Sequence, residues 1–244
     1  MRAAFETFAL IYNQVMDNSL YEAWLAFTLR HINEQNQLLE LACGTGELAI
    51  QFAKQGFGVT AIDLSEEMLA MANQQAQEKE VDVQFVQADM LDLTDIGHYE
   101  IVTCYSDSIC YLADEKAVQT AFEQVNQVLK ENGIFLFDVH SLYQMDDIFP
   151  EYNYHYQTDD FAFLWESYPT EVPHSIEHFL TFFIKNGEET FTREDELHVE
   201  RTYPIETYRR LLKQAGFSQV ELYADFKDCL PTKTSRRWFF VCHK

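Results

Sequence analysis

Positive charge is scarce in this sequence. Its 244 residues include 17 Lys and Arg against 40 Asp and Glu, which gives a formal net charge of −23 at pH 7. A surface of this sign repels phosphate backbones and anionic membranes before any specific contact forms. We therefore expect neither duplex nucleic acid nor a membrane as a partner.

Long apolar runs, cysteine motifs and low-complexity segments are also missing. The longest apolar runs, such as Phe8 to Tyr12, have five residues, whereas a membrane-spanning helix needs about 20. The five cysteines form no C-x-x-C motif, and residues 1–17 carry no basic region followed by a long apolar stretch. The five prolines and eight glycines are too few for a fibrous protein. We expect a reduced, cytoplasmic protein.

The sequence does contain enough apolar material for a core. Hydrophobic residues make up 47% of the chain and aromatic residues 15%, well above the content of a disordered chain. A chain of this length buries roughly 70% of the surface that its unfolded form exposes, so it needs no disulfide or structural metal to fold. The length fits one domain, or one domain with an insertion.

Apolar strand segments and helical stripes alternate along most of the chain. Two helices are expected before the first strand, and later helices are expected to begin at Ser65 and at Asp114, the second ending at Gly133. The expected strands are 38–43, 58–63, 83–86, 101–105, 134–139, 220–226 and 237–242. This alternation implies right-handed crossovers and ligand sites at the carboxyl ends of the strands. The predicted fold class is α/β, a Rossmann-like, mostly parallel seven-stranded sheet flanked by helices.

An antiparallel β insertion is predicted within this fold. Aromatic-rich strands are expected at 161–168, 176–185 and 190–202, with a strong hairpin signal at Asn186-Gly187 between the last two. We therefore divide the chain into an α/β core and an insertion. The core comprises residues 1–145 and 203–244, and the insertion comprises residues 146–202.

The strand predicted at 176–185 carries aromatic residues on both faces. Packing against the core accounts for only one of these faces. The insertion is therefore expected either to form a roof over a substrate pocket or to contact a second subunit, so we expect a monomer or a homodimer.

Glycine is concentrated at the first crossover. Four of the eight glycines lie between Gly44 and Gly58, where the backbone turns sharply and can approach a ligand without side chains. The pattern Glu40-x-Ala42-x-Gly44-x-Gly46 closes the first strand, Asp63 ends the second strand, and Asp89 follows the third. This arrangement resembles the class I S-adenosylmethionine-dependent methyltransferases, with Ala42 in place of the usual first glycine.

The resemblance implies a set of cofactor contacts. Glu40 would order the glycine loop, which would approach the methionine moiety, and Asp63 would hold both ribose hydroxyls. Leu64, Asp89 and Met90 would lie at the adenine, whereas Tyr12 and Tyr105 would lie toward the methionine end and the sulfonium. The cofactor would be S-adenosylmethionine and the product S-adenosylhomocysteine. The expected cofactor-binding residues are Tyr12, Glu40, Ala42, Gly44, Gly46, Asp63, Leu64, Asp89, Met90 and Tyr105.

Two other functions use the same residues. Gly44-Thr45-Gly46-Glu47-Leu48-Ala49 also satisfies G-x-G-x-x-A, and Asp63 lies 17 residues beyond Gly46, near the spacing of an NAD-binding fingerprint. An NAD-dependent oxidoreductase is therefore an alternative, and a non-catalytic cofactor-binding module is another. Glu40 within the first strand and the Asp89-Met90 pair favour a methyltransferase.

Four residues after the fourth and fifth strands are candidates for the acceptor site. Asp107 and His140 are the candidate catalytic residues, with His140 as the best base, and Tyr111 and Tyr143 are candidate substrate contacts. The segment after the fourth strand lacks the Asn/Asp-Pro-Pro-aromatic motif of enzymes that methylate planar amino groups. We therefore predict in-line methyl transfer to a small-molecule acceptor. No metal is expected, because no ligand-spacing motif such as H-E-x-x-H is present.

Overall fold

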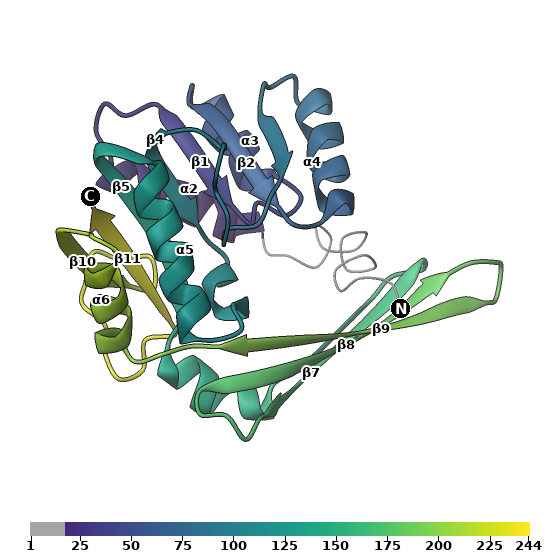
Figure 1. The fold of residues 1–244 in the computed structure, drawn as a ribbon. Coiled ribbons are helices and arrows are strands. Elements are labelled where there is room, and N and C mark those ends of the chain that lie inside the picture. The colour runs from purple at the N-terminus through teal and green to yellow at the C-terminus, as the bar shows by residue number, and fades with distance from the viewer. Residues whose placement is uncertain (1–17) are drawn as a thin grey trace.

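The computed structural model describes residues 18–244, which form two sheets (Figure 1). Sheet A has seven strands in the order β10-β11-β5-β4-β1-β2-β3, and β11 is antiparallel to both of its neighbours. The other contacts of the sheet are parallel. Its strands are β1 (Gln37–Leu41), β2 (Gly58–Asp63), β3 (Gln84–Gln87), β4 (Tyr99–Cys104), β5 (Leu129–His140), β10 (Gln219–Ala224) and β11 (Arg237–His243). The predicted α/β class and seven-stranded sheet are confirmed.

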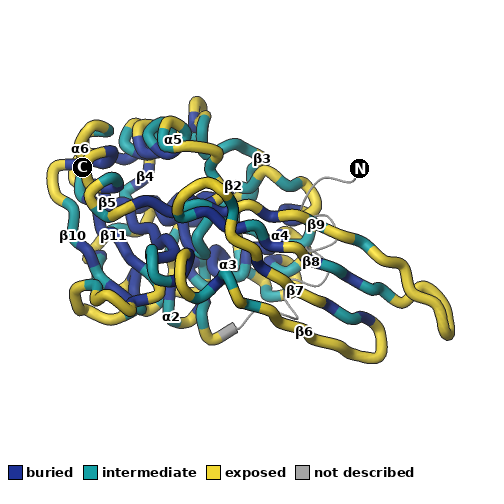
Figure 2. The backbone as a smooth tube through the Cα atoms, turned by 90° about the horizontal axis from the view of Figure 1, so that it is seen from below, coloured by how far each residue is buried: buried dark blue, intermediate teal, exposed yellow. Residues whose placement is uncertain are grey.

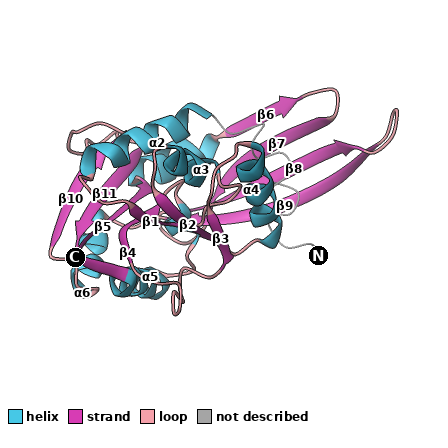
Figure 3. Ribbon diagram, turned by 90° about the horizontal axis from the view of Figure 1, so that it is seen from above, coloured by secondary structure: helices cyan, strands magenta, loops and turns pink. Residues whose placement is uncertain are grey.

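Helices cover both faces of sheet A (Figure 3). One face packs against α2 (Asn18–His31), α3 (Glu47–Lys54) and α4 (Glu66–Glu78), and the other against α5 (Glu115–Val128) and α6 (Ile205–Gln214). No helix among residues 18–244 is long and apolar enough to cross a membrane. Because both faces are covered, ligands can reach the sheet only at its edges.

Two local caps begin the helices where the sequence predicts them. Ser65 Oγ accepts a hydrogen bond from the Met68 amide at 3.1 Å, and an Asp114 carboxylate oxygen accepts one from Ala117 at 2.8 Å. The predicted end of α5 at Gly133 is wrong, because the helix stops at Val128 and β5 begins at Leu129. The Lys244 ammonium donates to the carbonyls of Asn126 and Leu129, both at 2.6 Å. A cation from the C-terminal segment therefore caps this helix.

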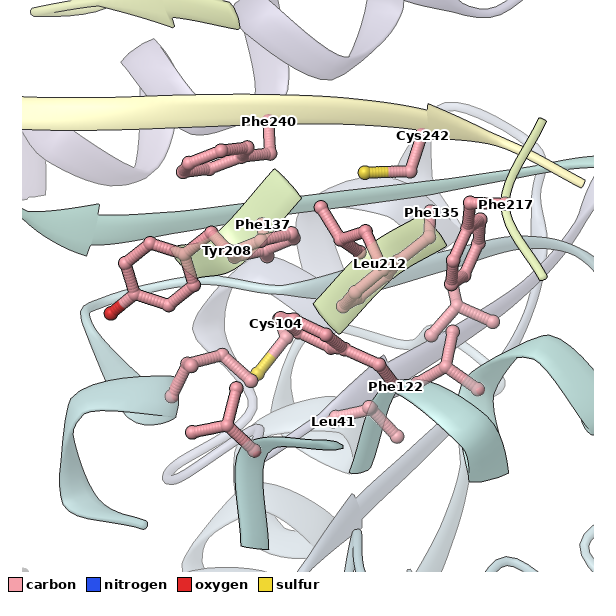
Figure 4. Close-up of a cluster of buried hydrophobic side chains, with 14 of the residues drawn as sticks. Leu41, Cys104, Phe122, Phe135, Phe137, Tyr208, Leu212, Phe217, Phe240 and Cys242 are labelled. Atoms are coloured by element: carbon pink, nitrogen blue, oxygen red, sulfur yellow. The ribbon is translucent and has the colours of Figure 1, made fainter. Parts of the chain in front are cut away.

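Aromatic residues fill the space beneath α5 and α6 (Figure 4). Phe137 of β5 stacks on Phe240 of β11 with centroids 4.7 Å apart, and Phe122 of α5 lies 5.2 Å from Phe137. These side chains are fully buried. This packing fixes β5 and β11 side by side, with His140 and Arg237 paired in register at one end.

Sheet B projects from the core as a long antiparallel arm (Figure 1). Its strands, in spatial order, are β6 (Asn153–Gln157), β7 (Phe161–Pro169), β8 (Ser175–Lys185) and β9 (Phe191–Arg201). The predicted hairpin joins β8 to β9, but its loop comprises the five residues 186–190, closed by the Asn186 amide donating to the Thr190 carbonyl at 3.0 Å. Gly187 does not take a positive φ. Residues near the tip of the arm are mostly exposed, whereas its base is buried (Figure 2).

Candidate active site

The glycine loop after β1 is held by the acid that ends β2. The Gly44 amide donates to one oxygen of Asp63 at 2.8 Å, and the Ser65 amide donates to the other at 2.9 Å. Ala42, Gly44 and Gly46 all have positive φ values, of 52°, 53° and 75°. Asp63 therefore fixes the loop at the carboxyl edge of the sheet, where parallel α/β sheets bind ligands.

Gly44 and Gly46 have different reasons to be glycine. A Cβ added to Gly46 would lie 2.8 Å from the Ala72 Cβ and 2.9 Å from the Phe85 ring, so this glycine permits close packing of α3 and α4. A Cβ on Gly44 would meet no atom of the described residues within 4 Å. The space beside Gly44 is open to a ligand, as a nucleotide-binding loop requires.

Glu40 is a carboxylic acid buried inside β1. Only 4% of its surface is exposed, and its Oε2 accepts no hydrogen bond from the described residues. Burial, reinforced by the nearby charge of Asp63, raises the pKa of Glu40 to about 8. Burial also raises the pKa of Asp63, against the effect of its backbone hydrogen bonds. A buried carboxyl oxygen with no partner among the described residues suits a ligand that brings a hydrogen-bonding group to this edge.

The residues predicted at the adenine lie along the same edge. Leu64 is 65% exposed directly after β2. Asp89 accepts a hydrogen bond from the Leu91 amide at 2.9 Å, and Met90 packs against the core. Leu64 follows β2 and Asp89 and Met90 follow β3, which pairs with β2 in parallel, so the three residues come after neighbouring strand ends.

Tyr105 directly follows β4 and is buried. Its hydroxyl lies 2.7 Å from Thr28 Oγ1, and its ring stacks on Trp24 of α2 at 6.2 Å. This tyrosine therefore joins α2 to the sheet, with 4% of its surface exposed. Tyr12, the other predicted tyrosine, lies outside the described residues.

A buried cluster of charged side chains lies at the ends of β4 and β5. Asp107 Oδ2 is 3.1 Å from His140 Nε2, and Glu200 Oε2 of β9 is 3.5 Å from the same nitrogen. Arg237 of β11 pairs with both Asp107 and Asp138. The predicted pair Asp107–His140 is therefore in contact, and three further charged residues join it.

Backbone geometry and charge determine the state of Asp107. Ser106 and Asp107 both take positive φ, of 56° and 58°, which turns the chain directly after β4. Burial alone would raise the pKa of Asp107, but the Arg237 guanidinium and the His140 imidazole hold it well below its usual range. Burial raises the pKa of Asp138, and Arg237 opposes that shift. Asp107 therefore stays ionised in the physiological range.

The two predicted substrate tyrosines occupy different surroundings. Tyr111 is 40% exposed and its ring lies 6.0 Å from His198 of β9, at the junction between the core and sheet B. Tyr143 is half-buried immediately before the π-helical turn η2 (Gln144–Ile148). Tyr111 thus borders the place where β9 meets the core.

Sequence reasoning missed Glu200, Arg237 and Asp138. Asp138 is fully buried in an otherwise apolar strand and accepts a hydrogen bond from Trp24 Nε1 at 3.0 Å. An acid inside the apolar run Ile134 to Val139 was a usable signal, because such a group needs a partner. Glu200 gave no such signal, because β9 carries acids along much of its length.

Comparisons with known proteins agree with this geometry. Residues 38–133 match the family model of a methyltransferase domain. A Geobacillus sp. (strain WCH70) protein provisionally named a methyltransferase is 40% identical over 245 residues, covering 98% of this chain and 99% of its own. The chain belongs to the class I S-adenosylmethionine-dependent methyltransferases. The glycine loop is therefore that of a methyltransferase and not of an NAD-dependent oxidoreductase.

Solved structures show the same architecture as this methyltransferase. An S-adenosylmethionine-dependent methyltransferase from Clostridium acetobutylicum ATCC 824 matches with a TM-score of 0.84 at 26% identity, covering 98% of each chain. The sugar N-methyltransferase KedS8 from Streptoalloteichus sp. ATCC 53650 matches with a TM-score of 0.77 at 19% identity, covering 100% of this chain and 94% of its own. The match extends through sheet B as well as the α/β core.

Proposed function

We propose that this methyltransferase acts on a small-molecule acceptor bound where sheet B meets the α/β core. The observation that carries the proposal is the buried cluster of Asp107, His140 and Glu200, which joins the ends of β4 and β5 to β9. Ligands of parallel α/β sheets bind at this edge. The fold shared with a sugar N-methyltransferase supports a small-molecule acceptor.

The α/β core, residues 1–145 and 203–244, is proposed to bind the cofactor. Gly44 offers an open backbone, Glu40 a buried carboxyl oxygen with no partner among residues 18–244, and Leu64 an exposed apolar surface. These features fit a nucleoside with a charged amino-acid end, and Ala42, Gly46, Asp63, Asp89 and Met90 complete the site. When bound, S-adenosylmethionine supplies an electrophilic methyl group.

Asp107 and His140 are proposed to meet the reacting atom of the acceptor. Methyl transfer from a sulfonium is an in-line displacement, so orientation alone can supply about 7–11 kcal/mol. Asp107 orients the His140 imidazole through a contact of 3.1 Å, and the imidazole can accept a proton that the acceptor loses. Tyr111 and Tyr143 would contact the rest of the acceptor.

Sheet B, within residues 146–202, is proposed to form the roof of the acceptor site. Phe149 packs edge-on against both His140 and His178, at 4.9 and 4.8 Å, and Thr202 Oγ1 donates to the His140 carbonyl at 2.7 Å. These contacts hold the residues on either side of sheet B against the charged cluster. The negative surface favours a neutral or cationic acceptor.

Binding of S-adenosylhomocysteine tests the cofactor site. At 100 times its dissociation constant, the ligand should stabilise the fold by about 2.7 kcal/mol. For a chain of this size the melting temperature should rise by about 5–10 °C, whereas NAD should leave it unchanged. A shift with NAD and none with S-adenosylhomocysteine would contradict the proposal.

Asp63→Ala tests the ribose contact by calorimetry. Because Asp63 also accepts two backbone hydrogen bonds, this variant should lose both affinity and stability, so affinity is measured well below its melting temperature. Asp82→Ala, which removes an exposed acid after α4, is the matched control and should bind normally. Equal affinities of the two variants would refute the assigned role of Asp63.

A further inference from the structure

Three potential metal ligands converge in the charged cluster. One ligand atom each from Asp107, His140 and Glu200 lies within 4.8 Å of the other two, and all three residues are largely buried. They follow β4, end β5 and lie on β9, so no sequence motif connects them. The expectation of no metal was based on the lack of such a motif and therefore does not address this site.

Glu200 points an unsatisfied oxygen into this group. Its Oε2 is buried and accepts no hydrogen bond from residues 18–244, and only 4% of the residue's surface is exposed. A buried carboxylate oxygen without a donor is costly, and such groups in native proteins usually have a partner or bind an ion. This observation points to a ligand independently of the spacing of the three residues.

The other oxygen of Glu200 already has a neighbour. The Trp165 indole nitrogen and the Ser167 hydroxyl lie 3.0 and 2.7 Å from His178 Nδ1. The other ring nitrogen of His178, Nε2, faces Glu200 Oε1 at 3.4 Å. Glu200 Oε1 is thus directed to His178, and Oε2 remains for a second partner.

Negative charge exceeds positive charge in the cluster. Asp107 and Asp138 share a single guanidinium, that of Arg237, and Glu200 pairs with no Lys or Arg among residues 18–244. Arg237 contacts Asp107 through Oδ1, which leaves Oδ2 directed toward His140. Buried negative charge without compensation destabilises the fold, and a cation would remove that cost.

We propose that Asp107, His140 and Glu200 form a binding site for one divalent cation of the Zn²⁺ or Mn²⁺ type. Two carboxylates and one imidazole suit these ions. In a tetrahedral site with bonds of about 2.0–2.2 Å, ligand atoms lie about 3.4 Å apart. The measured separations of 3.1 and 3.5 Å from His140 Nε2 are close to this spacing.

The cation goes beyond the proposed function and would change one part of it. With the cation bound, His140 is a ligand and is not free to act as a base. A hydroxyl or amine of the acceptor that binds at the open coordination position loses its proton more readily, because the metal stabilises the conjugate base. The proton then passes to solvent or to a neighbouring carboxylate. Asp107, His140 and Glu200 stay bound to the metal throughout.

Metal titration of the full-length protein tests this site. Protein treated with EDTA and dialysed should bind about one equivalent of Zn²⁺ or Mn²⁺ by calorimetry. Glu200→Gln should weaken binding at least about 10-fold. Glu194→Gln, the same change on the same strand and face, should bind as the wild type does. Binding that is equal in both variants, or absent from the wild type, would overturn the proposal.

A measurement on the unmodified protein covers the case in which Glu200→Gln does not fold. Mn²⁺ is paramagnetic, so it should broaden the side-chain NMR signals of His140 and His178 and leave that of exposed His98 unchanged. Broadening of all three signals, or of none, would contradict the site. S-adenosylhomocysteine binding is measured in parallel, because its loss would count against the proposed function and not against the cation site.

Discussion

Replacing Glu40 with glutamine should remove a pH dependence of stability that arises from one buried side chain. The pKa of Glu40 is 4.5 in an unfolded chain and about 8 in the folded protein, chiefly because of burial and secondly because of the charge of Asp63. Between these pH values the folded state holds a proton that the unfolded state has lost. The stability is therefore full at low pH and falls as the pH rises toward about 8.

The size of the effect follows from the difference in pKa. One proton held only by the folded state changes the free energy of unfolding by about 1.4 kcal/mol per pH unit. Between about pH 6 and about pH 7.5, the wild-type protein should lose about 2 kcal/mol through Glu40. Glu40→Gln has a similar shape and cannot ionise, so it should not show this loss.

Urea denaturation of the cofactor-free protein at several pH values measures the effect. The difference in free energy of unfolding between Glu40→Gln and the wild type should grow by about 2 kcal/mol in favour of the variant across this interval. Glu131→Gln, an exposed acid on β5, is the control and should follow the wild-type curve. If the curves for Glu40→Gln and the wild type run parallel, the acid does not carry the raised pKa that its burial implies.

The remaining predictions concern the glycine loop and the buried acid of β5. Gly46→Ala should lower the free energy of unfolding by about 1–3 kcal/mol, because its Cβ meets Ala72 and Phe85. Gly44→Ala should lower the free energy of unfolding by about 1 kcal/mol through backbone strain. It should lower the affinity for S-adenosylhomocysteine by more than this loss of stability explains, and an unchanged affinity would show that no ligand lies beside Gly44. Asp138→Asn should cost about 3–5 kcal/mol in urea denaturation, because it leaves Arg237 partly unpaired in a buried position, and a loss below about 1 kcal/mol would contradict this account.

Local signals in the sequence determined the α/β architecture. Apolar segments recur with the periods of strands and helices, since each element must bury one face or both, and this pattern predicts all seven strands of sheet A. Ser65 and Asp114 cap helices through hydrogen bonds that span three residues. The glycine loop was equally predictable, because positive φ favours glycine and Asp63 ends the neighbouring strand.

Contacts between distant segments were decided only by the tertiary structure. Lys244 caps the C-terminal end of α5, although the helix lies more than 100 residues earlier in the chain. The sequence around Gly133 therefore gave a misleading position for the end of this helix. The dipeptide Asn186-Gly187 predicts a two-residue hairpin loop, but the loop has five residues. The Asn186 amide donates to the carbonyl of Thr190, which is the last residue of this loop.

The charged cluster is the clearest case of a site that only the fold assembles. Asp107 and His140 were predictable because both follow strands of the parallel sheet, whose carboxyl ends meet at one edge. Glu200 could not be distinguished from the other acids of β9 until the register of sheet B placed it beside His178 and His140. Sequence periodicity identifies which face of a strand is buried, whereas the position of sheet B against the core decides which buried acid meets which imidazole.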